Sequence, residues 1–179
     1  MTNNIEVEIR SFITKQKYEE LITLLTKEGE LLSEDYQETY YFDSEEDLRI
    51  QKNNFFSKVW MKKGKIHDEA REEIEIKFSK DDFEKAEKLF LGLGYKVKIK
   101  WFRNRHTFKW QNIEVMIDYT KGYGHIIEME IMTSEENKES AIKTLKEKMN
   151  QLKIPLTTKE EFEKRFNDYK ENWEELIKS

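Results

Sequence analysis

The chain has 179 residues, a length that suits one domain able to bury about two-thirds of its unfolded surface. It contains no cysteine, which excludes disulfides, thiolate zinc sites and cysteine nucleophiles and fits a reducing compartment, so we expect a cytoplasmic protein. Its formal net charge is -5 although 39% of its residues are charged, and no apolar run approaches the ~20 residues that cross a bilayer. We therefore expect a single domain over residues 1–179 that is neither exported nor bound to a membrane.

A charged strand followed by an amphipathic helix recurs along the chain. The first copy starts with the alternating stretch IEVEIR at residues 5–10 and continues into a helix that Thr14 can cap. The second starts at residues 72–78, with its helix after Ser79 or Asp81, and a weaker third copy starts at residues 127–131. A last helix is predicted from about Thr158 to Lys178, because the apolar residues there fall at helical spacing.

Runs of alternating or β-rich sequence lie between these helices. They cover residues 37–43, 48–51, 55–62, 97–110 and 113–119, with short polar turns such as Gln111 and Asn112 between them. Together with the charged strands this makes about eight strands, mostly joined as hairpins, which favours antiparallel pairing. We expect a fold of the α+β class.

The charges fall on one side of each strand, since side chains alternate across a strand with a period of two. Glu6, Glu8 and Arg10 share one face of the first strand, and its opposite face is apolar. By the same alternation, the charged or polar faces of the other strands hold Arg49, Gln51, Lys58, Lys62, Arg71, Glu73, Glu75, Lys77, Arg103, Arg105, Glu114, Asp118, Glu128 and Glu130.

Two arrangements account for this pattern. In the first, the charges face water from the open side of a half-covered antiparallel sheet. The ion pairs of such a surface contribute only about 0 to 1 kcal/mol each, so stability alone explains so many charges poorly. In the second, the sheet curls into a closed eight-stranded antiparallel β-barrel, a tunnel lined by charges with the α-helices packed outside. Carboxylates bind hard divalent cations, and arginine and lysine bind phosphate, so a tunnel of this kind indicates a site for metal and polyphosphate.

Several motifs, in order along nearly the whole chain, resemble those of one family. EVEIR is similar to its ExExK signature, YYFDSEEDLRIQ to its YFD followed by LRIR, and REEIE to its RxExE. FSKVWMKKG, RNRHTF, MIDYTKGYGHIIEMEI and the terminal YKENWEELI resemble further elements of that family. The chain thus resembles the CYTH superfamily of triphosphate tunnel metalloenzymes, which includes thiamine triphosphatases, inorganic triphosphatases and class IV adenylyl cyclases.

The resemblance implies roles for the charged residues. It implies catalytic roles for Glu6, Glu8 and Arg10, and binding of Mg²⁺ or Mn²⁺ by Glu6, Glu8, Glu73, Glu75, Asp118, Glu128 and Glu130. It implies phosphate binding by Arg10, Arg49, Lys62, Arg103 and Arg105, to which alternation adds Lys58, Arg71 and Lys77. Arg10 stands where the signature usually has lysine, and Gln51 replaces the second arginine of LRIR, which removes one cation.

The implied partner is a small molecule that bears a triphosphate, bound by a monomer or a homodimer. We exclude nucleic acid, because carboxylates on neighbouring strands would repel a long phosphate backbone. Water attacking the terminal phosphorus would make the protein a triphosphatase, which we place first because hydrolysis demands less of the nucleoside end. A ribose hydroxyl attacking the α-phosphorus of ATP would instead form cyclic AMP, and a binding module without catalysis is the third alternative.

Overall fold

The structure is a computed structural model that describes residues 4–62 and 73–178. In these residues the strands are β1 (Asn4–Ile13), β2 (Glu30–Phe42), β3 (Asp47–Lys52), β4 (Ser57–Lys62), β5 (Glu73–Phe78), β6 (Val97–Trp110), β7 (Ile113–Thr120) and β8 (Gly124–Ser134). The α-helices are α1 (Lys15–Glu28), α2 (Phe83–Gly92), α3 (Lys138–Gln151) and α4 (Lys159–Leu176). Across the described chain, no helix combines the length and the apolar composition that crossing a bilayer requires.

The strands form one antiparallel sheet in the order β1-β8-β7-β6-β2-β3-β4-β5. The α+β class and the antiparallel pairing are as expected. However, β1 and β5 are the two edges of the sheet, and they do not pair with each other within residues 4–62 and 73–178. The prediction of a closed eight-stranded β-barrel is therefore wrong, and the sheet is open.

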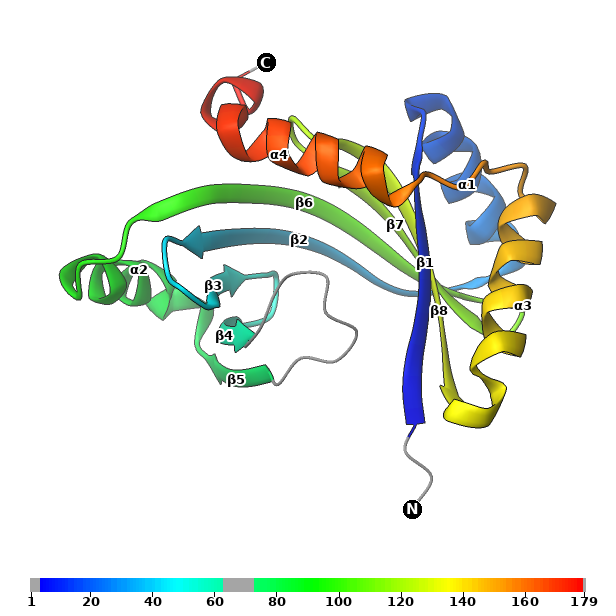
Figure 1. Cartoon of the computed structure of the whole chain (residues 1–179), viewed down its shortest axis with the longest axis horizontal. Coiled ribbons are helices and arrows are strands. Elements are labelled where there is room, and N and C mark those ends of the chain that lie inside the picture. The colour runs from blue at the N-terminus through cyan, green and yellow to red at the C-terminus, as the bar shows by residue number, and fades with distance from the viewer. Residues whose placement is uncertain (1–3, 63–72, 179) are drawn as a thin grey trace.

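β2 and β6 pair along most of their length and form a long two-stranded ribbon. The sheet stays open because the strands that lead to its two edges attach at opposite ends of this ribbon. β7 pairs with the segment of β6 from Arg103 to Trp110. β3 pairs with Glu38 to Tyr41 of β2, which lie opposite residues 99–102 of β6. β7, β8 and β1 therefore extend from one end of the ribbon, and β3, β4 and β5 from the other (Figure 1). Closing a barrel requires a stagger that brings the two edge strands into register, and this offset separates them.

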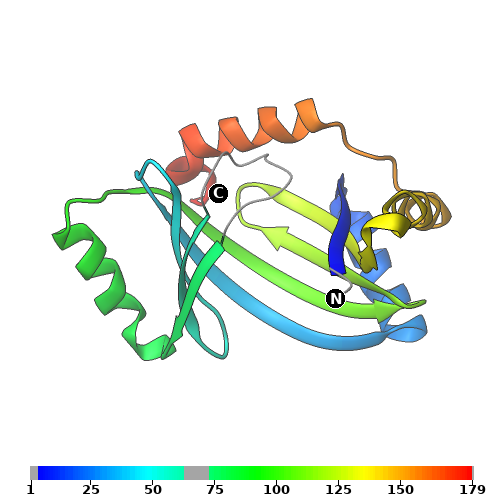
Figure 2. The ribbon, with the colours of Figure 1, turned by 60° about the horizontal axis from the view of Figure 1, so that its bottom comes forward.

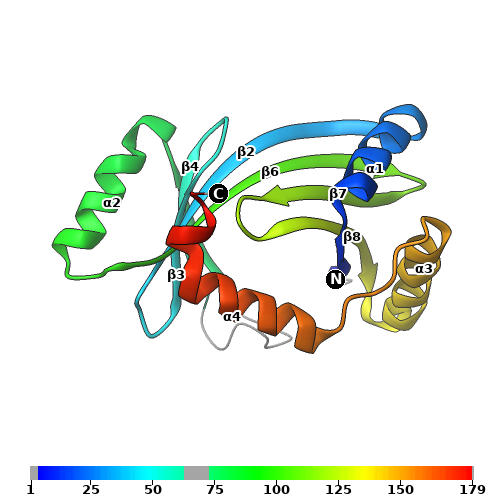
Figure 3. The ribbon, with the colours of Figure 1, turned by 90° about the horizontal axis from the view of Figure 1, so that it is seen from above.

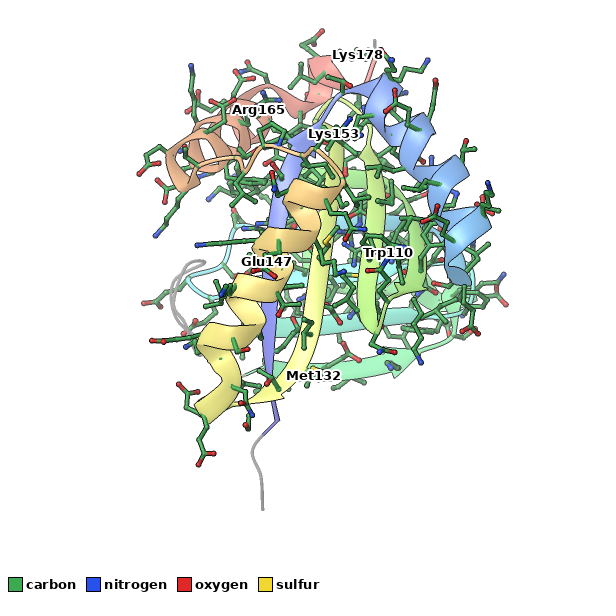
Figure 4. All side chains as sticks on the ribbon, turned by 90° about the vertical axis from the view of Figure 1, so that its right-hand side faces the viewer. Trp110, Met132, Glu147, Lys153, Arg165 and Lys178 are labelled. Atoms are coloured by element: carbon green, nitrogen blue, oxygen red, sulfur yellow. The ribbon has the colours of Figure 1, made fainter. Side chains whose placement is uncertain are left out.

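Three helices cover the apolar side of the sheet. α1 and α3 pack on the β1, β6, β7 and β8 end, where Leu25, Val115 and Leu145 are fully buried. Figure 4 looks onto this end, with Trp110 labelled between α1 and α3. α2 covers the other end, where Phe83 packs against Tyr40 and Ile50 in a smaller core. Burying the apolar side leaves the charged side of every strand on the opposite face, as the alternation predicts.

Helix α4 lies on that opposite side and spans from one part of the sheet to another (Figure 2, Figure 3). Near its start, Phe162 stacks on Phe12 of β1 with the ring centroids 4.6 Å apart. Further along, the Tyr169 hydroxyl donates to the backbone carbonyl of Lys100 at 2.8 Å, and the Trp173 indole N–H donates to that of Lys98 at 3.0 Å. α4 thus partly covers the face that carries the charges.

Local signals at the helix ends are mostly confirmed. The Thr14 side chain accepts a hydrogen bond from the Lys17 N–H and caps α1, and Thr158 caps α4 in the same way. The turn at Gln111 and Asn112 has two residues with positive φ, as a tight hairpin requires.

Candidate functional site

The charged face is the side of the sheet on which the predicted site residues lie. Residues paired in register on neighbouring strands point to the same side. Glu8 pairs with Glu130, which pairs with Glu114, and the next row joins Arg10 to Glu128. Arg105 pairs with both Asp118 and Asp35, which extends the face across β7, β6 and β2. Continuing the pairing places these further residues on it: Gln37, Arg49, Gln51, Lys58, Trp60, Lys62, Glu75, Lys77 and Arg103.

The structure does not describe the side chains of two predicted site residues, Arg71 and Glu73. Arg71 lies in the part of the chain that is not described, and for Glu73 only the strand position is described, paired with Lys62.

The acidic part of the charged face is formed by β1, β8 and β7. Burial and the neighbouring charges of Glu6, Glu114, Glu128 and Glu8 raise the pKa of the Glu130 carboxyl to about 7. Burial also raises the pKa of Glu128, although Arg105 opposes that change. Carboxylates that destabilise one another in this way favour the binding of a cation. Among the described residues, however, no three His, Cys, Asp or Glu side chains are arranged to hold a metal ion.

Two arginines lie beside this acidic part, and one buried carboxylate joins them. Asp118, 3% exposed, accepts hydrogen bonds from Arg105 Nε at 2.8 Å and from Arg105 Nη2 at 2.7 Å. The same carboxylate accepts from Arg103 Nη1 at 3.4 Å. Although burial opposes it, hydrogen bonding to Asp118 raises the pKa of Arg105 above its ordinary value. Burial and the charge of Arg105 lower the pKa of Arg103, against the attraction of Asp118. The two guanidinium groups are thus held next to each other on one anion.

Arg103 is also held from β2. The Gln37 side-chain oxygen accepts from Arg103 Nε at 2.9 Å and from Arg103 Nη2 at 2.5 Å. The Gln37 side-chain nitrogen donates in turn to Asp35 at 2.9 Å. Neither Asp35 nor Gln37 was among the predicted site residues. The signal for both was present in the alternation Asp35, Gln37, Thr39, Tyr41, but the predicted strand started only at residue 37 and Gln37 is uncharged.

Three further predicted cations, Arg49, Lys58 and Lys77, have partners on their own part of the sheet. Arg49 donates to both oxygens of Asp47, at 2.6 and 2.5 Å, and its guanidinium lies 4.2 Å from the centre of the Tyr41 ring. Lys58 donates to Glu75 at 2.7 Å, and Lys77 lies 3.5 Å from the same carboxylate. The structure thus divides the predicted residues into a group on β1, β8, β7 and β6 and a second group on β3, β4 and β5.

A cavity of about 240 Å³ lies between these groups and under α4. Arg10, Arg49, Arg103, Asp118 and Glu128 contribute to its polar wall. Its apolar wall is mainly aromatic and contains, besides Ile126, the rings of Tyr41, Trp60, Trp101, Tyr123, Phe162 and Phe166. Side chains from β1, β2, β3, β4, β6, β7 and β8 therefore converge on one cavity although the sheet is open. Phe162, Phe166 and Tyr123 were not predicted as lining residues, because α4 and the β7–β8 turn supply them from distant parts of the sequence.

The comparisons with known proteins agree with one another. The CYTH domain family matches residues 4–162. A protein of Methanocaldococcus jannaschii named "Putative adenylate cyclase" is 34% identical over 162 residues, which cover 83% of this chain and 88% of the relative. A conserved hypothetical protein from Pyrococcus furiosus has a similar structure, with a TM-score of 0.67, 26% identity, and coverage of 84% of this chain and 92% of that one. A solved structure from Bacillus halodurans with the same cyclase name has a TM-score of 0.62 at 17% identity, over 88% of this chain and 95% of that one, which shows a shared fold.

Proposed function

Because the chain belongs to the CYTH family, we propose that it is a divalent-metal-dependent enzyme that hydrolyses a triphosphate-bearing small molecule on the charged face of its sheet. The observation that carries this proposal is the position of the Arg103 and Arg105 pair on Asp118, with Arg105 Nη2 3.5 Å from the Glu128 carboxylate of the acidic part. Positive groups that bind phosphate oxygens and acidic groups that bind a divalent ion are both needed for phosphoryl transfer, and here they are adjacent.

The residues fit a divalent ion by the chemistry of their donors. Glu6, Glu8, Glu128 and Glu130 offer carboxylate oxygens, which Mg²⁺ and Mn²⁺ prefer, and burial together with the neighbouring acidic groups raises the pKa of Glu130. When bound there, such an ion would supply positive charge to the phosphate oxygens and lower the pKa of an attacking water. Asp118 is assigned a different role, since both of its oxygens already accept from arginine.

The chain's own residues bind and orient the substrate. Arg103 and Arg105 would neutralise the charge that develops on the transferred phosphoryl group, because their guanidinium groups are already ordered by Asp118. Arg10 lies in register with Glu128 and lines the cavity, so it would contact the same chain of phosphates. Because arginine does not lose its proton at physiological pH, Arg10 acts by charge and hydrogen bonding and not as a general base.

The aromatic cavity favours a second candidate, cyclisation of ATP to cyclic AMP and pyrophosphate. Trp60 and Trp101 line the cavity together with Arg103, so a planar base in the cavity would be adjacent to phosphates bound at the arginines. The cyclase name of the M. jannaschii relative supports the same candidate.

Product analysis separates the candidates. Purified protein is incubated with inorganic triphosphate, thiamine triphosphate or ATP, each with Mg²⁺ or Mn²⁺, and phosphate, cyclic AMP and pyrophosphate are measured. Phosphate release without cyclic AMP supports hydrolysis, and cyclic AMP with pyrophosphate supports the cyclase. Saturable binding without any product would refute both and indicate a binding module.

Variant Glu8→Gln tests the site itself. We expect it to lose activity, because the amide removes one negative oxygen from the acidic part of the charged face. Glu19→Gln makes the same chemical change on the exposed surface of α1 and should leave the rate unchanged. A Glu8→Gln enzyme as active as the wild type would remove Glu8 from the reaction.

A further inference from the structure

The Gln37 side chain occupies one edge of the Arg103 guanidinium, and Arg103 lines the cavity. A guanidinium donates hydrogen bonds along two edges, a side edge formed by Nε and one Nη, and a terminal edge formed by the two Nη nitrogens. The Gln37 oxygen bonds to Nε at 2.9 Å and to Nη2 at 2.5 Å, so it occupies the side edge. Nη1 also donates to Asp118 at 3.4 Å, which uses one of its two N–H groups, and Nη2 keeps a second N–H beside the one that it donates to Gln37. The end of the guanidinium therefore retains N–H groups that can bind the oxygens of a phosphate.

The orientation of the Gln37 amide is fixed by its second partner. Its nitrogen donates to Asp35 at 2.9 Å. A carboxylate only accepts and a guanidinium only donates, so an amide between the two has a single compatible orientation, with its oxygen toward Arg103. Asp35 thus ensures that the Gln37 oxygen, which accepts hydrogen bonds, and not the Gln37 nitrogen, which donates them, faces Arg103.

Asp35 is itself ordered from the opposite side. It is 8% exposed, and its other oxygen accepts the backbone N–H of Asn54, in the turn between β3 and β4, at 2.9 Å. Asp35 and Gln37 are two residues apart on β2, so both side chains are on the charged face. A chain of hydrogen bonds therefore runs from the β3–β4 turn through Asp35 and Gln37 to Arg103. Arg103 extends this chain to Asp118, which also accepts a hydrogen bond from Arg105.

We propose that Gln37 and Asp35 are positioning residues that hold Arg103 with its terminal guanidinium edge toward the triphosphate of the substrate. The assignment rests on the proposed function, since it takes Arg103 as a phosphate-binding residue. It adds two residues that touch no substrate and that act through the orientation of an arginine. Gln37 contributes this orientation without cancelling the charge of Arg103, which a carboxylate at the same position would do.

The test uses inorganic triphosphate as the ligand, measured by titration calorimetry on the full chain. Gln37→Met keeps the approximate length of the side chain but removes the acceptor, and we expect binding about tenfold weaker than in the wild type. Asp35→Asn should weaken binding by less, because its remaining oxygen can still accept from Gln37. Ser33→Ala, at the next position of β2 on the same face, is the matched control and should bind as the wild type does. Thermal melting of each variant shows that it is folded.

A double-mutant cycle with Arg103→Met separates positioning from a general structural effect. If Gln37 acts through Arg103, Gln37→Met causes less than a twofold further loss in the Arg103→Met background. An equal loss in both backgrounds, or wild-type affinity in Gln37→Met, would overturn the inference and leave the proposed function intact, provided that Arg103→Met itself binds more weakly. If the wild-type protein does not bind triphosphate, the proposed function fails, and this inference fails with it.

Discussion

Replacing Asp118 with asparagine tests whether one buried carboxylate organises the arginine pair. The change keeps the shape of the side chain but removes its charge and one acceptor. Asp118 accepts three hydrogen bonds from the two guanidinium groups, at 2.8, 2.7 and 3.4 Å. In the variant, two neighbouring cations remain with much less compensation.

The size of the effect follows from the burial of the partners. Breaking a buried ion pair by removing one partner costs about 3–5 kcal/mol. The side chains of Arg103 and Arg105 keep 23% and 19% of their exposure, and Glu128 lies 3.5 Å from Arg105, so water and this second acid compensate in part. We therefore expect Asp118→Asn to lower the free energy of unfolding by about 2–3 kcal/mol. For a domain of this size the melting temperature should fall by about 4–12 °C.

Urea denaturation at neutral pH, with thermal melting alongside, measures this loss. The matched control is Asp81→Asn, the same change at an exposed position after β5, which should alter the stability by less than about 0.5 kcal/mol. If Asp118→Asn were as stable as that control, Asp118 would not be compensating buried cations, and the description of the site around it would be wrong.

Two further predictions concern the acidic part of the charged face and the anchor of α4. The raised pKa of Glu130, about 7 against 4.5 for an ordinary glutamate, means that the unfolded chain loses this proton first as the pH rises. The contribution of Glu130 to the free energy of unfolding should thus be fully present below about pH 4.5 and be lost between about pH 4.5 and pH 7. The Glu130→Gln variant should not show this loss. Urea titrations of both proteins across this range with a chelator present measure it, and parallel curves would contradict it. Tyr169→Phe removes the hydroxyl that donates to the Lys100 carbonyl from a side chain that is 1% exposed, so it should cost about 1 kcal/mol. Hydrogen exchange in α4 should be faster in Tyr169→Phe than in the wild type, while exchange in α3 should not change. Unchanged exchange in α4 would show that this bond does not anchor the helix.

The sequence alone was sufficient to predict which side chains lie on each face of a strand. Alternation within a strand depends only on backbone geometry, so it placed Glu8, Arg105 and Glu128 on the charged face without knowledge of their neighbours. Helix starts such as Thr14 were predicted for a similar reason, because a cap bonds to the backbone three residues away. The glycine at position 29 is an exception. It follows the first helix, where a glycine commonly adopts a left-handed conformation, but its φ is −117°, and a Cβ there would lie 2.9 Å from the Lys109 carbonyl.

Only the tertiary structure decided how those strands combine. Whether the sheet closes depends on where β3 and β7 attach along the β2–β6 ribbon, which is set by long-range register and not by any local pattern. The same register decides that Asp118 binds Arg105 and that Gln37 binds Arg103, and the path of α4 brings Phe162 to the cavity. Local geometry therefore determined which side chains face the site, while long-range pairing determined their partners, because each partnership depends on the relative positions of segments distant in the chain.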